Sequence, residues 1–497
     1  MMASFTLAEL VQGISAGISI LLDSELALRA LKINTDTRTI ETGDVFLALR
    51  GDNFDGHDYL VQAKAQGAIA AIVDETYVTE LKNRLNLSSV NASDVPLPLL
   101  VVADTLLALG LAGQWNREKF TGPLIAITGS AGKTSVKSMA AHMMQLLGDC
   151  WSTPGNFNNH IGAPLTLLGL DASHKAAVIE LGASGKGEIA YSSQFAKPDV
   201  AIITNVSGAH LEGFGSIETI MQTKGEIIDS LSANGCVVLN ADDVFFADWV
   251  LRAGERKVIS FGIENYADLT AQNIICDDAG SRFDVVYQQK ELQQKELQQK
   301  GPQEKVVSCE IPLLGRHNVL NALSAIAAGL ALNLELAAIC IQLKTMPVVA
   351  GRLQWIDGHD GIRILNDSYN ASPASVKAAI DVLGLWKEKA WLVLGDMAEL
   401  GEDSAVIHAE MGEYAKHIGI ANLVATGNAC RHAVEAFNKD FDIRSAYWFD
   451  QQSDLLNYIN EKKQPGQVFL VKGSRSAGMD KVVAALSLKS DAQNGEV

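Results

Sequence analysis

The sequence predicts an α/β protein with three domains, each organised around a largely parallel β-sheet. A chain of 497 residues is too long for one hydrophobic core, and its length suggests about three domains. Short apolar stretches typical of buried strands alternate with longer stretches typical of helices. Hydrophobic residues make up 48% of the chain and aromatic residues only 6%, which suits helices packed closely on parallel sheets. We expect a small N-terminal α/β domain at residues 1–104, a central parallel-sheet domain at 105–348 and a Rossmann-like C-terminal domain at 349–497.

The N-terminal domain combines short elements with two polar loops. We expect a strand at residues 45–49, a helix at 59–66 and a strand at 68–73, followed by a loop at 87–98 that contains two prolines. The polar loops are Thr35-Asp36-Thr37-Arg38 and Asp55-Gly56-His57-Asp58. Polar loops on a rigid scaffold often bind ligands, although an ordinary group of solvated turns explains the same residues.

The central domain contains a glycine-rich loop between a strand and a helix. The apolar run 124–127 leads into Thr128-Gly129-Ser130-Ala131-Gly132-Lys133-Thr134-Ser135, and good helix formers follow. Such a loop curls backbone amides toward a phosphate, while the lysine supplies charge and the threonine hydroxyl can bind magnesium. We therefore expect it to bind a nucleoside triphosphate. Two residues separate its glycines where the usual P-loop has four, which points away from GTPases and most kinases.

Polar side chains follow several predicted strands of the central sheet. Strands are expected at residues 177–181, 200–204, 236–240 and 257–262. Ligands of parallel sheets bind beyond the carboxyl ends of the strands, so Gly129, Glu180, Asn205 and Asn240 are expected to share one crevice. A glutamate beside a phosphate-binding loop suits magnesium, which prefers oxygen ligands, although a salt-bridged or capping carboxylate is the alternative. His210 and Lys224, taken alone, are more typical of structural or solvated residues.

Two further polar regions and one insert complete the pattern. The amides of Asn156, Asn158 and Asn159 can hold a polar ligand or cap turns. In the C-terminal domain, strands expected at 362–365, 390–394, 422–425 and 468–471 are followed by polar residues, including Asp367, Lys472 and Arg475. Two sheets with polar edges suggest a cleft between domains. The glutamine-rich repeat at 288–304 fits neither helix nor strand periodicity, and we expect an exposed loop at a hairpin tip without chemistry.

Charge and cysteine usage exclude several classes of protein. The formal net charge of -18 argues against a broad nucleic-acid-binding surface. The six cysteines include no C-x-x-C pair, so neither a zinc site nor a disulfide framework is indicated, and reduced, mostly buried thiols are expected. No secretory signal or membrane span is apparent, because polar residues interrupt the most apolar stretches. We expect a cytoplasmic protein that acts as a monomer.

In this order along the chain, the shortened P-loop, Glu180, Asn205 to His210, Lys224, Asn318 and Arg352 resemble the Mur ligases. The likeness runs from Thr35 to about Leu486. It is carried by four specific strings: Gly155-Asn156-Phe157-Asn158-Asn159, His210-Leu211-Glu212-Gly213-Phe214-Gly215, Gly395-Asp396-Met397-Ala398-Glu399-Leu400-Gly401 and Val471-Lys472-Gly473-Ser474-Arg475-Ser476. Within the family, the sequence is most similar to the ligases that act on UDP-N-acetylmuramoyl-tripeptide and D-alanyl-D-alanine.

The resemblance implies amide formation in two steps. ATP phosphorylates the free carboxylate of the tripeptide, and the amine of the dipeptide then attacks the acyl phosphate. A carboxylate is a poor acyl donor until its oxygen becomes part of a phosphate leaving group, so the enzyme must hold three charged partners in line. A sister ligase of the same family, a P-loop kinase and a nucleotide-binding regulator are the competing interpretations.

The resemblance also implies roles for individual residues. ATP would be held by residues 129–135, with Lys133 on the β and γ phosphates, Asn318 at the adenine, Arg352 at the phosphates and Asp367 at the ribose. Thr134 and Glu180 would hold one Mg²⁺ and His210 a second. Lys224 matches a lysine that is carbamylated in the family, and with Lys133 and His210 it would be catalytic. The substrate-binding set would be Thr35, Asp36 and Arg38 at the uridine end, together with Asn156, Asn158, Asn159, Lys472 and Arg475.

Overall fold

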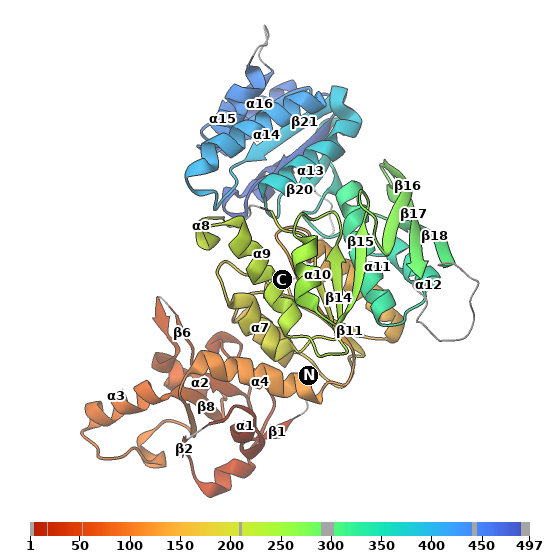
Figure 1. Cartoon of the computed structure of the whole chain (residues 1–497). Coiled ribbons are helices and arrows are strands. Elements are labelled where there is room, and N and C mark those ends of the chain that lie inside the picture. Colours follow the sequence, from red (N-terminus) through yellow and green to blue (C-terminus); the bar gives the residue numbers. More distant parts are fainter. Residues whose placement is uncertain are drawn as a thin grey trace, which may run out of the picture.

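The computed structural model describes residues 4–16, 18–51, 53–207, 211–289, 303–439 and 445–488. Three main β-sheets follow one another along the chain, one in each expected region. The N-terminal and C-terminal parts lie at opposite ends of the central part (Figure 1). The sequence-based division at residues 104 and 348 agrees with this order but stays a prediction at the level of single residues.

The N-terminal sheet has the strand order β2-β9-β8-β5-β4. Its strands are β2 (Ile18–Ile20), β4 (Ile33–Asn34), β5 (Val45–Leu47), β8 (Ala70–Asp74) and β9 (Leu99–Val102). All pairs are parallel except β2 with β9. The helices are α1 (Leu7–Gly13), α2 (Leu60–Gln66) and α3 (Glu75–Leu85). Helix α3 is absent from the expected elements, because Leu81 is its single fully buried residue and the apolar period is weak.

The central sheet has nine strands in the order β11-β12-β10-β13-β14-β15-β16-β17-β18. Its parallel strands include β10 (Leu124–Thr128), β11 (Cys150–Ser152), β12 (Ala176–Glu180), β13 (Val200–Ile203), β14 (Cys236–Asn240) and β15 (Lys257–Gly262). The sequence places β14 and β15 correctly at both ends, because each is an apolar run bounded by turn residues.

Helices bury both faces of the central sheet. On β10, Ile125 and Ile127 pack with α5 (Lys133–Met144) and α11 (Arg316–Ala331), whereas Leu124 and Ala126 belong to the core of the opposite face. Side chains of a strand alternate between faces, so a continuous apolar strand marks a sheet covered on both sides. The opposite face is covered by α6 (Gly162–Leu168), α7 (Glu188–Ala196), α9 (Ile217–Asp229) and α10 (Phe246–Ala253), while α12 (Leu336–Lys344) joins the α5 side.

An antiparallel extension of the central sheet is absent from the expected elements. It consists of β16 (Leu269–Asp277), β17 (Gly280–Gln289) and β18 (Gln303–Ile311). The pairing of β17 with β18 continues to Gln289 and Gln303, directly beside the glutamine-rich repeat. Residues 290–302 of that repeat lie outside the described residues, but the strands that flank them form a hairpin, as the sequence predicts.

The C-terminal sheet has the order β19-β20-β24-β21-β22-β23. The strands are β19 (Gln354–Asp357), β20 (Arg363–Asp367), β21 (Ala390–Gly395), β22 (Asn422–Thr426), β23 (Ala446–Phe449) and β24 (Val468–Lys472). Only β19 is antiparallel to its neighbour. Its helices are α13 (Pro373–Leu383), α14 (Ser404–Ile418), α15 (Cys430–Asn438), α16 (Gln452–Lys462) and α17 (Met479–Leu486). This is the doubly wound α/β arrangement that the sequence predicts.

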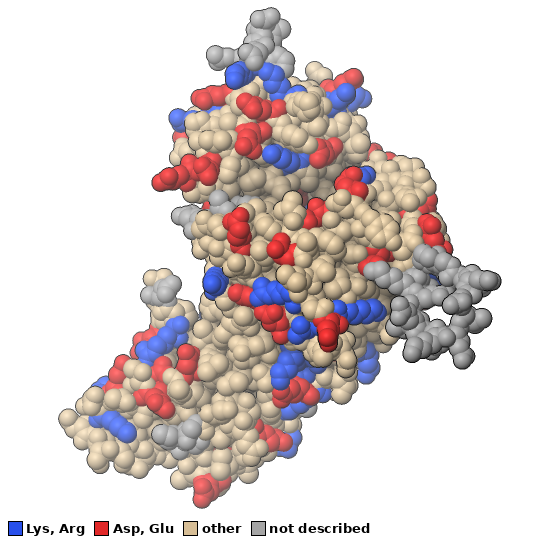
Figure 2. Space-filling view, viewed as in Figure 1, with Lys and Arg blue, Asp and Glu red and all other residues tan. Residues whose placement is uncertain are grey.

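Cysteines and hydropathy agree with the sequence-based expectations. All six cysteines are free thiols, and four of them, Cys236, Cys309, Cys340 and Cys430, are buried. Among the helices of the described ranges, none has both the length and the apolar character that crossing a membrane requires. On the face shown in Figure 2, acidic and basic side chains are interspersed over all three parts, without a continuous basic surface among the described residues.

Candidate functional site

The glycine-rich loop is held against the end of strand β13. Gly129 has φ +147°, and a Cβ atom there would lie 1.9 Å from Thr204 Oγ1. Gly132 has φ +83°, directly before helix α5 begins. Thr204 Oγ1 also donates to the carbonyl of Ala131 at 2.6 Å. Both glycines are therefore favoured by close contacts, since a Cβ at Gly132 would lie 2.5 Å from Asn321 Oδ1, and by a backbone conformation that L side chains disfavour.

Asn205 fixes the conformation of the loop. Its Oδ1 accepts from the Ala131 N–H at 3.0 Å, its Nδ2 donates to the Ala131 carbonyl at 3.1 Å, and its own carbonyl accepts from the Ser130 N–H at 2.9 Å. Asn240 Nδ2 donates to the Thr204 carbonyl at 3.1 Å. Gly129, Asn205 and Asn240 therefore lie close together at one edge of the sheet, and a crevice shared with Glu180 stays a prediction. The N–H groups of the first turn of α5 have no acceptor within the helix, which is the arrangement that suits a phosphate.

Lys133 folds back over the loop. Its Nζ donates to the Gly129 carbonyl at 2.6 Å and the Ser130 carbonyl at 3.3 Å. Burial lowers the pKa of Lys133; the charge of Glu180 opposes this shift and that of Arg352 adds to it. A phosphate oxygen is a stronger acceptor than a neutral carbonyl, so a bound triphosphate would draw this ammonium from the carbonyls.

Glu180, at the end of β12, lies among polar groups from three segments. Its Oε1 accepts from Asn158 Nδ2 at 2.8 Å and lies 3.4 Å from Thr134 Oγ1. Its Oε2 lies 3.3 Å from Lys137 Nζ, yet it is buried without a hydrogen bond of good geometry. The oxygen atoms of Thr134 and Glu180 therefore form a donor set that suits a hard cation such as Mg²⁺.

Lys137 is a site residue that the sequence analysis does not single out. Its Nζ donates to the carbonyls of Thr153 at 2.9 Å and Gly155 at 3.0 Å, in addition to its ion pair with Glu180. The available signal is its place one helical turn after Lys133, which puts both lysines on the same face of α5. This buried cation ties the loop that begins at Thr153 to the P-loop helix.

The three asparagines of the following loop have different surroundings. Asn158 contacts Glu180, whereas Asn159 Oδ1 accepts from the N–H groups of Ile161 at 3.2 Å and Gly162 at 2.8 Å, at the start of α6. Asn156 is exposed. Asn158 thus lies at Glu180, Asn159 caps the start of α6, and Asn156 is the exposed one of the three.

Lys224, on α9, is buried with a relative exposure of 2%. Its Nζ lies 3.5 Å from the Ala183 carbonyl and 5.5 Å from the centroid of the Phe214 ring. Burial, and after it the charge of Lys133, lowers the pKa of Lys224 to about 7, while Glu188 and Glu226 act in the opposite direction. A large fraction of this amine is therefore neutral near pH 7. His210 lies outside the described residues.

Arg352 brings the C-terminal sheet region to the P-loop. Its Nη2 lies 3.5 Å from Thr134 Oγ1, and its guanidinium carbon lies 4.5 Å from the centroid of the Tyr369 ring. Its Nε is buried without a hydrogen-bond partner. The guanidinium thus approaches the phosphate-binding loop with donor capacity to spare.

Several predicted binding residues are paired with one another or with the backbone. Asn318 is buried, donates to the Leu314 carbonyl at 2.8 Å and accepts from Asn321 at 3.1 Å. Asp367 and Lys472 form a buried ion pair at 2.5 Å, and Lys472 also donates to the Asn370 carbonyl at 3.0 Å. Arg475, in contrast, is exposed. If Asn318, Asp367 or Lys472 contacts adenine, ribose or substrate, that residue must share or exchange the interactions given above.

The N-terminal loops form their own polar site. Asp36 Oδ2 and Arg38 Nη2 lie 2.6 Å apart, and hydrogen bonds from Arg38 lower the pKa of Asp36 to about 2. Thr35 lies beside this pair in the chain. In the second loop, His57 Nδ1 lies 2.6 Å from Asp55 Oδ1. These loops belong to the N-terminal part, which lies away from the C-terminal part, and the surface between the N-terminal part and the rest is hollowed on the left of Figure 2.

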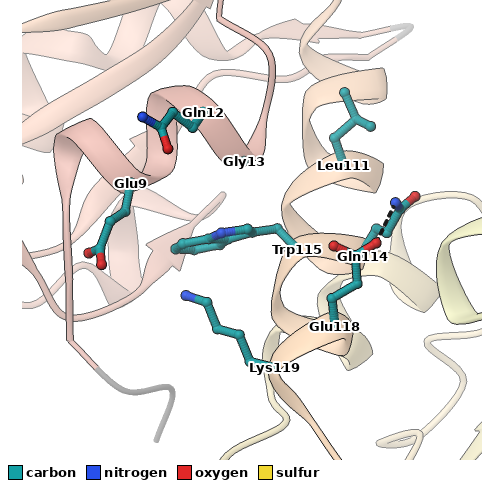
Figure 3. Close-up of a pocket in the computed structure, with 8 residues that line it drawn as sticks. All are labelled: Glu9, Gln12, Gly13, Leu111, Gln114, Trp115, Glu118 and Lys119. Carbon is teal, nitrogen blue, oxygen red and sulfur yellow. Dashed lines mark hydrogen bonds between the residues drawn. The ribbon is translucent and has the colours of Figure 1, made fainter.

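A pocket of about 350 Å³ lies between α1 and α4 (Thr105–Lys119), away from the P-loop (Figure 3). Its charged groups already have partners: Glu9 accepts from Thr6 at the start of α1, Glu118 pairs with Lys197, and Lys119 lies over the Trp115 ring. A further group, Asp396, His408 and Cys430, has the composition of a metal site. However, His408 Nε2 accepts from the Met397 N–H at 3.0 Å and Nδ1 donates to the Ser404 carbonyl at 2.7 Å, which leaves no nitrogen lone pair for a metal.

Three family models match the chain. The Mur ligase middle domain matches residues 127–329, the glutamate ligase domain of Mur ligases matches 351–475, and the Mur ligase family catalytic domain matches 32–109. A curated relative from Escherichia coli (strain K12), named UDP-N-acetylmuramoyl-tripeptide--D-alanyl-D-alanine ligase, is 38% identical over 492 residues, covering 98% of this chain and 99% of the relative. The relative of the same name from Bacillus subtilis (strain 168) is 32% identical, covering 91% and 92%.

Solved structures agree with the sequence relatives. MurF from Acinetobacter baumannii superposes with a TM-score of 0.83 at 32% identity, covering 97% of this chain and 98% of that chain. MurF ligase from Thermotoga maritima, in complex with ADP, gives a TM-score of 0.74 at 25% identity, covering 91% and 96%. The similarity therefore extends over all three sheets rather than over the P-loop region alone.

Proposed function

The chain belongs to the Mur ligase family, and from this we propose that it is an ATP-dependent ligase that joins D-alanyl-D-alanine to the carboxylate of UDP-N-acetylmuramoyl-tripeptide. The reaction yields ADP, phosphate and a pentapeptide precursor of peptidoglycan. We further expect the enzyme to act as a cytoplasmic monomer.

The observation that carries this proposal is the convergence of two domains on the phosphate-binding loop. Lys133, Thr134 and Glu180 come from the central sheet region, and Arg352 arrives from the start of the C-terminal region. In a protein with a net charge of -18, two cations that face one loop favour a polyanionic ligand at this position. A ligase needs this geometry, because the nucleotide, the carboxylate and the amine must all meet at one place.

In the first step, a carboxylate oxygen of the tripeptide attacks the γ phosphorus of ATP, and the bond between that phosphorus and the bridging oxygen of ADP breaks. Lys133 and Arg352 would offset the negative charge that spreads over the transferring group. In the second step, the amine of the dipeptide attacks the acyl carbon, phosphate leaves, and the amine loses a proton. The products are an amide, ADP and inorganic phosphate.

The oxygen donors Thr134 and Glu180 fit Mg²⁺, and Glu180 Oε2 has no hydrogen bond of its own. When bound, the ion would neutralise charge on the phosphate oxygens. The chain's own contribution is to hold Glu180 in place through Asn158 and Lys137. A second ion at His210 stays a prediction, since that residue lies outside the described ranges.

Carbamylation of Lys224 forms part of the proposal. A neutral amine attacks carbon dioxide, forming an N–C bond and releasing a proton, and burial that lowers the pKa of Lys224 to about 7 supplies the neutral amine. The nearby Lys133 charge would favour the resulting anion. The modification would convert the neutral amine into an anionic carbamate whose oxygens can support a metal.

The remaining predicted residues are assigned to the two ends of a long substrate. Thr35, Asp36 and Arg38 would bind the uridine end, and Asn156 and Arg475, both exposed, would bind the peptide end. Asn318 and Asp367 would bind the nucleoside of ATP. Asn159 and Lys472 would support the part of the site that surrounds the peptide. The position of the N-terminal part at one end of the molecule suits a substrate that spans from a nucleotide to a peptide terminus (Figure 1).

The decisive experiment measures phosphate release from ATP with each substrate withheld in turn. We expect release only when both UDP-N-acetylmuramoyl-tripeptide and D-alanyl-D-alanine are present. Equal turnover without the dipeptide would indicate a kinase, and activity with an amino acid in place of the dipeptide would indicate a sister ligase. Absence of turnover with every combination, despite nucleotide binding, would favour a regulator.

A further inference from the structure

Two arginines of the C-terminal region, the half-buried Arg352 and the exposed Arg475, lie near the ring of Tyr369. The guanidinium carbon of Arg352 lies 4.5 Å from the centroid of this ring, and that of Arg475 lies 5.9 Å from the same centroid. Tyr369 is half-buried and lies two residues after the end of β20. An aromatic ring within about 6 Å attracts a guanidinium through its quadrupole, so both arginines lie within the range of this interaction.

The backbone on both sides of Arg352 is docked against the segment that carries this ring. Gly351 has φ +70°, and a Cβ atom there would lie 3.2 Å from Tyr369 Cβ. The Tyr369 N–H donates to the Gly351 carbonyl at 3.3 Å, and Leu353, at φ +48°, donates its N–H to Asp367 at 3.3 Å. The segment 351–353 is therefore docked on the segment that contains Asp367 and Tyr369, and the backbone of Arg352 is held close to the ring.

Other interactions of the Arg352 guanidinium are weak. Its contact with Thr134 is 3.5 Å long, at the limit of a hydrogen bond, and its buried Nε has no partner. Two neighbouring cations repel it, since the charge of Arg352 lowers the pKa of both Lys133 and Lys472 further. The ring of Tyr369 supplies an attractive contact that offsets this repulsion.

We propose that Tyr369 is a positioning residue, whose ring holds Arg352 in the direction of the phosphate-binding loop. This inference rests on the proposed function, in which Arg352 binds the phosphates of ATP. Tyr369 itself touches neither nucleotide nor metal in this proposal and acts through Arg352. The nearby Arg475 adds positive charge on the same ring and thereby makes the position more attractive to an anion.

The test measures binding of a non-hydrolysable ATP analogue by calorimetry, which does not require turnover. Y369L should weaken binding about fivefold, the effect of losing a partly desolvated cation–π contact. Y369F keeps the ring and should restore binding to within about twofold of the wild type. The matched control is Y266L, at a tyrosine that is 82% exposed and distant in sequence, which should bind like the wild type.

A double-mutant cycle separates positioning from a general structural role. In the R352M background, Y369L should cause no further loss of analogue binding, because the partner of the ring is already gone. An equal loss in both backgrounds, or a loss in Y369F as large as in Y369L, would overturn the proposal. If thermal unfolding shows that Y369L is not folded, R352K tests the same contact by changing the cation instead of the ring. Lysine keeps the positive charge but lacks the planar face of the guanidinium.

The proposed function and this inference fail in different ways. Wild-type protein that binds the analogue and releases phosphate with both substrates, while Y369L binds as tightly as wild type, contradicts only the positioning role. Wild-type protein without dipeptide-dependent phosphate release contradicts the ligase assignment, whatever the behaviour of Y369L.

Discussion

Lys137 Nζ lies 3.3 Å from Glu180 Oε2, and both side chains are almost fully buried. The ammonium also donates to the carbonyls of Thr153 and Gly155. A buried ion pair adds little to the stability of the fold compared with an apolar pair of similar size. Removal of one partner, however, leaves an uncompensated charge in a low dielectric. Lys137 is therefore expected to matter for the folding of the site as well as for the position of Glu180.

From this pair we predict that K137M lowers the free energy of unfolding by about 3 kcal/mol in urea denaturation. The double variant K137M/E180Q should recover part of that loss, because neither buried charge remains. The exposed pair Lys377–Glu410, at 3.4 Å, is the control, and K377M should cost less than about 1 kcal/mol. Equal effects of K137M and K377M would show that burial of the first pair has no energetic consequence.

For the phosphate-binding loop we predict that K133A lowers turnover at least about a hundredfold, because a cation facing the transferring phosphate is lost. Its thermal midpoint should stay near that of the wild type, since the Lys133 ammonium donates its hydrogen bonds to loop carbonyls rather than to the core. K257A is the matched control: Lys257 is exposed and begins β15, at the end of the sheet opposite the site. Retained phosphate release in K133A would refute the role of Lys133.

The sequence predicted the parts of this site that depend on local pattern. The P-loop, its strand and its helix are contiguous, and Glu180, Asn205 and Asn240 could be placed together because parallel strands end at one edge. Lys137 could not be recognised, since its partners Thr153 and Glu180 lie on other segments and a lone helical lysine is usually solvated.

The register of the strands and their antiparallel pairing could also not be predicted from the sequence. Asp367 and Lys472 are direct partners in the β20–β24 register, so two residues predicted as separate binding groups form one ion pair. The hairpin at the repeat was expected, but the bounds of β16 to β18 were not predicted, because their half-buried alternation resembles polar loops. Helix α3, with a single fully buried residue, gave too weak an apolar period to be recognised.

For Lys224 we predict that K224A is inactive and that a small carboxylate added to the assay partly restores turnover. The substitution removes the atom that would carry the carbamate, and a free carboxylate can occupy the same position. K186A, at an exposed lysine, should retain activity without added carboxylate. A metal-bound crystal of the wild-type protein with an unmodified Lys224 amine would contradict the carbamate.

The carbamate should also depend on pH in one direction. Lys224 has its pKa lowered to about 7, by burial first and by Lys133 second, so the amine is neutral above this pH and protonated below it. Because only the neutral amine reacts with carbon dioxide, the carbamylated fraction should fall as pH decreases through about 7. The measurement is the NMR signal of protein equilibrated with isotopically labelled carbon dioxide, with K224A as the blank. A signal that rises toward acid pH would contradict the assignment.

The uridine end of the substrate gives a test that is separate from the ATP site. Arg38 is exposed and pairs with Asp36, in a domain that does not contribute to the P-loop. We predict that R38A raises the KM for UDP-N-acetylmuramoyl-tripeptide about tenfold, the cost of one charge-assisted hydrogen bond, and leaves the KM for ATP unchanged. R38K should be intermediate, because it keeps the charge but loses the guanidinium fork.

Arg84 is the matched control for that prediction, since it is an exposed arginine on α3 of the same domain and belongs to neither polar loop. R84A should leave both KM values unchanged. A rise in the KM for ATP that equals the rise for the UDP substrate would mean that R38A disturbs the whole enzyme. An unchanged KM for the UDP substrate in R38A would show that Arg38 is not part of the binding site. The loop around Asp55 and His57 would then be the candidate for the uridine pocket, and alanine variants of that loop would test it.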